Sequence, residues 1–112
     1  MVGGLLVLLA VAVLQLALAL HVRNSLVDAA AEGARYGALA DRGPADAVRR
    51  TAELIELAVG EGYAQDISVS SGSFRGHPVL TVTVRATLPL LGLLGPARAL
   101  EVSGRGVVET LD

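Results

Sequence analysis

The histidine, serine and acidic side chains are the residues of this 112-residue chain whose types could support metal binding or catalysis. His21 and His77 have no other His, Asp or Glu at a spacing typical of metal ligands. No serine stands in a Gly-x-Ser-x-Gly turn, which would expose a nucleophile. The segment 72–76 has two glycines, but it lacks the lysine and the following helix of a phosphate loop. The residues therefore predict no catalytic, metal-binding or cofactor-binding group.

No pair of acidic residues is set apart from the charges of the predicted helices. We therefore expect a protein that is not an enzyme. A membrane-tethered enzyme is the alternative from another class, and a cluster of acids or histidines would be its mark.

The composition limits the possible partners. The net charge is −2, all nine basic residues are arginines, and there is no cysteine. The only aromatic residues are two tyrosines and one phenylalanine. Because nucleic-acid binding calls for basic patches and stacking aromatics, we expect no nucleic-acid partner.

The segment Val2–Leu20 is apolar or glycine except at Gln15. As a helix it would be ~28 Å long, close to the ~30 Å hydrocarbon core of a bilayer. Residues 1–21 are therefore predicted to form a transmembrane helix in contact with membrane lipid. Gln15, near mid-span, either hydrogen-bonds to a partner helix or is tolerated alone.

A secretory signal peptide is the competing interpretation, because Ala17-Leu18-Ala19 offers a small-residue cleavage site. It would release a small binding or adhesion domain after cleavage near Ala19. The apolar run is longer than the ~7–15 residues of a signal core, and no basic residue precedes it, so a retained anchor is favoured. Arg23, the first flanking charge, would by itself place the head in the cytoplasm.

The helical pattern continues over residues 22–40 and becomes amphipathic. Ala29, Gly33 and Gly37 lie four residues apart on its apolar side. Interior glycine costs a helix about 1 kcal/mol relative to alanine, so these positions predict a very close neighbour. The neighbour is either the sheet of the same head or the helix of another subunit.

The remaining pattern predicts an α+β head over residues 22–112. A second helix is expected at 44–60, with Val48, Ala52 and Ile55 on its apolar face. Antiparallel strands are expected at about 66–71, 78–88 and 99–109, with a loop at 71–77 and glycines that weaken the last strand. The helices would cover one face of the three-stranded sheet. The leucine-rich loop 89–96 either plugs the core or contacts the membrane or a partner.

The stretch from Ala19 to Tyr36 resembles the TadE-like proteins, which are minor pilin-like subunits of tight-adherence (Flp) pilus systems. The matching residues are Arg23, Asn24, Leu26, Ala29, Ala30, Glu32, Gly33, Ala34 and Arg35. The resemblance covers the first 40 residues, and the rest by layout only. The Pro-Leu-Leu-Gly loop before the last strand is similar to actinobacterial members.

The resemblance implies a single-pass protein of the cytoplasmic membrane with its head outside, able to reach the cell surface in a pilus. Implied partners are other pilin-like subunits, pilus-assembly membrane proteins and a prepilin peptidase. Family members have a basic leader, a glycine at its cleavage point and a nearby glutamate, all absent here. We therefore hypothesise that the true start lies upstream of Met1, which would also supply the basic flank that turns the head outward.

Overall fold

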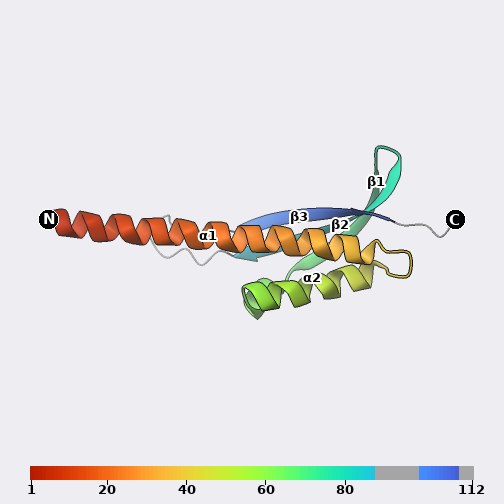
Figure 1. The fold of residues 1–112 in the computed structure, drawn as a ribbon, viewed down its shortest axis with the longest axis horizontal. Coiled ribbons are helices and arrows are strands. Elements are labelled where there is room, and N and C mark those ends of the chain that lie inside the picture. The colour runs from red at the N-terminus through yellow and green to blue at the C-terminus, as the bar shows by residue number, and fades with distance from the viewer. Residues whose placement is uncertain (88–98, 109–112) are drawn as a thin grey trace.

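The computed structural model describes residues 1–87 and 99–108, which form one long helix and a small head (Figure 1). The elements are α1 (Val2–Gly37), α2 (Pro44–Ala58), the 3-10 turn η1 (Glu61–Tyr63), β1 (Ile67–Phe74), β2 (His77–Thr87) and β3 (Ala99–Val107). The strands form an antiparallel sheet in the order β1-β2-β3. The predicted α+β class is confirmed.

Helix α1 is continuous over 36 residues because no proline interrupts it. It ends at Gly37, three residues before the predicted end at 40. The backbone N–H of Ala38 donates to the carbonyls of Ala34 (3.0 Å) and Arg35 (3.3 Å). This shared hydrogen bond tightens the last turn, so the chain leaves the helix early.

Helix α2 begins after Gly43, whose backbone N–H donates to the Asp46 carboxylate at 2.9 Å. Pro44 occupies the first turn, where its missing N–H costs nothing. The helix ends at Ala58, two residues before the predicted end.

The buried face of α2 differs from the predicted one. Ala47, Thr51 and Ile55 are fully buried, whereas Val48 and Ala52 are only partly buried. The prediction at Ile55 was right, but the helix is rotated so that small residues meet α1. The pattern of large apolar residues could not indicate this rotation, because the contact between the helices depends on small side chains.

The predicted loop at 71–77 is a tight hairpin instead. Phe74 pairs with His77, which leaves Arg75 and Gly76 as a two-residue turn. Both have positive φ, 54° and 81°, as a type I′ turn requires. Because two residues complete the reversal, the serines and glycine before them remain in β1.

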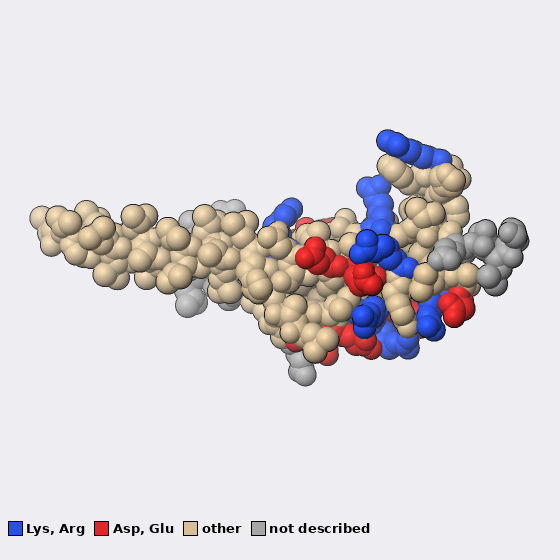
Figure 2. Space-filling view, in the orientation of Figure 1, with Lys and Arg blue, Asp and Glu red and all other residues tan. Residues whose placement is uncertain are grey.

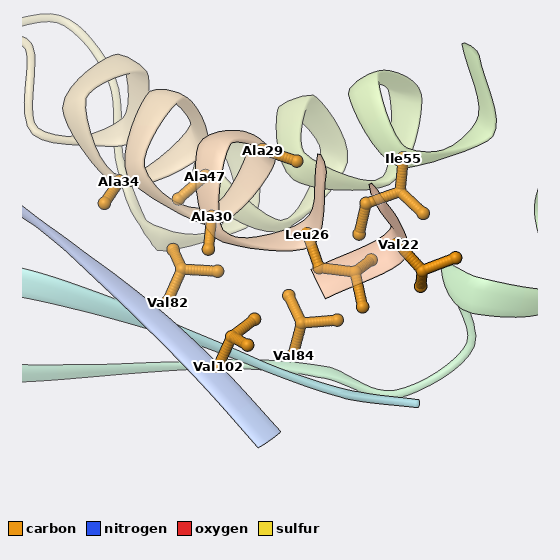
Figure 3. Close-up of a cluster of buried hydrophobic side chains, with 10 residues drawn as sticks. All are labelled: Val22, Leu26, Ala29, Ala30, Ala34, Ala47, Ile55, Val82, Val84 and Val102. Atoms are coloured by element: carbon orange, nitrogen blue, oxygen red, sulfur yellow. The ribbon is translucent and has the colours of Figure 1, made fainter. Parts of the chain in front are cut away.

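Both helices cover the same face of the sheet, α1 over β2 and β3 and α2 over β1 (Figure 1). Their buried side chains meet those of the strands in one core (Figure 3). The core cluster comprises Val22, Leu26, Ala29, Ala30, Ala34, Ala47, Ile55, Val82, Val84 and Val102. Neither helix covers the opposite face of the sheet, whose side chains include Thr81 and Thr83.

Candidate functional site

The N-terminal half of α1 projects from the head with its apolar side chains exposed. Its most apolar window of 18 residues has a mean hydropathy of 2.7 and is only 6% buried. The projecting half carries neither acidic nor basic side chains in Figure 2, whereas charges cluster over the head. By length and composition, α1 could therefore cross a membrane.

The environment of α1 changes abruptly at Val22. His21 is exposed, whereas Val22 is 2% exposed and begins the core of the head. The helix is unbroken at this point. The projecting half and the wall of the head are therefore one element, and the orientation of the projecting half is coupled to that of the head.

Gly33 and Gly37 lie where α1 approaches α2. A Cβ atom at Gly33 would overlap the Thr51 hydroxyl and lie 2.9 Å from the Ala47 carbonyl oxygen. A Cβ atom at Gly37 would overlap the Ala47 methyl group and lie 3.0 Å from its Cα. The predicted close neighbour is therefore the second helix of the same head. Within the head, the second helix rather than the expected sheet faces these two glycines.

A second close contact joins α1 to β3. A Cβ atom at Gly104 would lie 2.5 Å from the Ala31 Cα, and one at Gly106 would lie 2.5 Å from the Ala34 carbonyl oxygen. The sequence analysis treated these two glycines as weak points of the strand and missed this role. Their spacing was the available signal. Val102, Gly104 and Gly106 are two residues apart, so all three lie on the buried face of β3.

The other predicted packing residues occupy two different settings. Ala29 is 4% exposed and belongs to the core of the head. Gln15 is partly buried within the projecting half of α1. Its hydrogen bond to another helix, and an assembly role for the glycines, remain predictions.

The residues of the predicted family motif divide into two groups. The buried members are Leu26, Ala29, Ala30, Gly33 and Ala34. The members at the surface are Arg23, Asn24, Glu32 and Arg35. Glu32 and Arg35 form an exposed ion pair at 2.9 Å, of a kind worth less than about 1 kcal/mol. Glu32 and Arg35 also line a hollow between α1 and α2, so the motif combines packing of the head with a polar surface.

In the part of the chain that the structure describes, no cluster of side chains is suited to binding a metal ion. No group of three or more His, Cys, Asp or Glu side chains could hold an ion there. His21 and His77 are exposed, on α1 and at the start of β2 respectively. The predicted contact loop 89–96 lies outside the described residues.

The fold is thus a long apolar helix, able by length and composition to cross a membrane, that continues into a small α+β head. The family model described as TadE-like protein matches residues 1–35, which lie almost entirely within α1. The chain is thus TadE-like over its long helix, and the resemblance seen in the residues is confirmed. This match connects the chain with the assembly of tight-adherence (Flp) pili. No curated protein and no solved structure matches the chain.

Proposed function

We propose that this chain is a non-enzymatic, minor pilin-like subunit of a Flp-type pilus. The projecting half of α1 would anchor it in the cytoplasmic membrane as a single pass. The head would lie outside, and the chain could later enter a pilus at the cell surface. Packing between helices, rather than catalysis, would be its activity.

The observation that carries this proposal is the continuity of α1 from its uncharged, exposed half into the core of the head. In water, a helix with this much exposed apolar surface would associate or aggregate. In a bilayer the same surface is matched to lipid. When such a helix leaves lipid, helices of neighbouring subunits would be its natural replacement, as in a fibre.

The proposed partners follow from this arrangement. Membrane lipid comes first, then other pilin-like subunits and the membrane proteins that assemble the pilus. Gln15 would hydrogen-bond to a neighbouring helix, since an amide in hydrocarbon gains from a polar partner. A prepilin peptidase would process the chain if a leader precedes the apolar helix.

The test is to determine the mature N-terminus of the native protein in two fractions of its own cells, the membranes and the sheared surface material. Intact mass and N-terminal peptides give the answer directly. We expect the apolar helix to be retained in both fractions. A processed start upstream of the helix, just after a glycine, would add support for prepilin processing.

A mature start at Leu20 would contradict the proposal. It would mean that the apolar segment is a signal peptide and that a secreted domain is released. Retention in the membrane without any appearance in sheared pili would instead limit the chain to a role in assembly at the membrane.

A further inference from the structure

The face of the sheet that the helices leave uncovered carries a hydroxyl-lined hollow of about 340 Å³. Val82 and Val84 point into the core, so the alternating residues Thr81 and Thr83 point to the other face. The register places Ser70 and Arg105 on either side of Thr81. The hollow therefore draws its lining from all three strands.

The β1–β2 hairpin supplies one wall of the hollow, through residues 70–74 of β1. Val79 is only 6% exposed although it lies on the face that neither helix covers. The Arg105 guanidinium lies 5.0 Å from the centre of the Phe74 ring, although β2 separates their strands. The side chains of Phe74 and Arg105 therefore meet across β2. Figure 1 shows the tip of the hairpin rising away from the sheet, at the end of the molecule opposite the N-terminus.

Arg105 lies on the rim of the hollow, and Arg75 lies just beyond it, against the Phe74 ring. The Phe74 ring contacts the guanidinium of Arg75 at 5.2 Å as well as that of Arg105. Such cation–π contacts restrict the positions of both charged groups. Within residues 1–87 and 99–108, neither guanidinium has a carboxylate at ion-pair distance, whereas neighbouring Arg85 is paired with Glu101 at 3.3 Å. The rim is therefore positively charged on a chain with a net negative charge.

We infer that this hollow binds a carboxylated sugar unit. The Arg105 guanidinium can match a carboxylate through two parallel hydrogen bonds, and the charge of Arg75 beyond Phe74 adds to the attraction for an anion. The hydroxyls of Ser70, Thr81 and Ser103 line the hollow beside them and suit the hydroxyls of a sugar. A nucleic-acid strand would need a longer basic track and several stacking aromatics.

The site is independent of membrane anchoring, because it lies on the head and uses no residue of α1. It would give a subunit exposed outside the cell a means of contacting acidic polysaccharide. The inference goes beyond the proposed function, and binding in vitro tests it separately.

The experiment measures binding of trigalacturonic acid to the full chain in detergent micelles by titration calorimetry. Its fully methyl-esterified form is the matched uncharged probe, and a short single-stranded oligonucleotide is the competing anion. We expect the acid to bind, the ester to bind at least about tenfold more weakly, and high salt to weaken binding of the acid.

Arg105→Gln should weaken binding of the acid about tenfold, since it removes one charge-assisted pair. Arg75→Asn removes the second charge with a residue that tolerates the turn, so it tests the site even if the first variant folds poorly. The control is Arg49→Gln, which makes the same change of charge on α2, where Arg49 pairs with Asp46. It should leave binding unchanged.

Several results would overturn the inference. Equal binding of the ester and the acid would show that the arginines do not recognise the carboxylate. An equal loss of binding in Arg49→Gln would show that only the overall charge of the protein matters. Absence of binding to the acid would refute the site. Tighter binding of the oligonucleotide would assign the rim to another class of ligand.

Discussion

Gly33 of α1 lies directly against Thr51 of α2. A methyl group at Gly33 would overlap the Thr51 hydroxyl oxygen and approach the Ala47 carbonyl oxygen to 2.9 Å. Thr51 is fully buried, and its hydroxyl donates to that same carbonyl at 2.8 Å. Because one obstacle is backbone and the other is held by a hydrogen bond, neither can move aside cheaply.

The first prediction is that Gly33→Ala destabilises the head although alanine favours helix. The helix gains about 1 kcal/mol from the substitution. Overpacking costs about 1–3 kcal/mol, and here the backbone of α2 must shift, so we expect a net loss of stability. Hydrogen exchange of the β2 amides in the full chain should become faster. Gly33→Leu should abolish folding of the head while leaving membrane insertion intact.

Two further variants separate this clash from a general effect of alanine. Gly62→Ala is the control, because a Cβ atom there would meet nothing within 4 Å. Thr51→Ala combined with Gly33→Ala removes the overlapping hydroxyl and should restore part of the stability. Unchanged exchange in Gly33→Ala alone would show that the helices separate easily.

The second prediction concerns the contact between β3 and α1. A Cβ atom at Gly106 would lie 2.5 Å from the carbonyl oxygen and 2.7 Å from the carbonyl carbon of Ala34. Gly106→Ala should therefore lower the free energy of unfolding by about 1–3 kcal/mol. Gly72→Ala is the matched control, since Gly72 is also in a strand and has open space around it. Denaturant unfolding of both variants measures the difference, and equal stabilities would contradict the close contact.

Periodicity predicted much of the fold because it reports burial directly. Leu80, Val82 and Val84 alternate with polar residues, and all three are buried. The glycines of β3 show the limit of this reasoning. Their sequence context indicates a weakened strand, whereas their function depends on α1 lying opposite, about 70 residues away in the chain. Which backbone approaches a glycine is decided by the tertiary structure.

The hairpin and the hollow beside it show a second limit. Serine and glycine in segment 71–77 indicated a loop, yet only Arg75 and Gly76 make the turn. Residues of all three strands line the hollow, and they come together only when this hairpin has formed. Neither Phe74 nor Arg105 stood out as a site residue in the sequence, because their contact across β2 depends on the tertiary structure of the hairpin.

The third prediction tests the projecting half of α1 as a membrane span. Leu9 is 61% exposed and lies near the middle of the apolar run. Leu9→Arg would place a charge at mid-bilayer, at a cost of about 2.5–3.5 kcal/mol on insertion scales. We expect this variant to be lost from the carbonate-resistant membrane fraction. Leu57→Arg is the control, because Leu57 is 84% exposed on the head and should not affect retention. Equal retention of both variants would contradict a membrane span.

The last prediction concerns the hairpin turn that shapes the proposed sugar site. Gly76 has a φ of 81° and open space around it, so Gly76→Ala would be penalised by backbone conformation alone. The expected cost is about 1–2 kcal/mol, seen as faster hydrogen exchange in β1 and weaker binding of the acidic sugar. Arg75→Asn should keep the turn intact, because asparagine tolerates positive φ, and should weaken binding without faster exchange. The two variants thus separate the shape of the hollow from its charge. If both variants bound the acidic sugar as tightly as the unchanged protein, the hairpin would contribute nothing to the site.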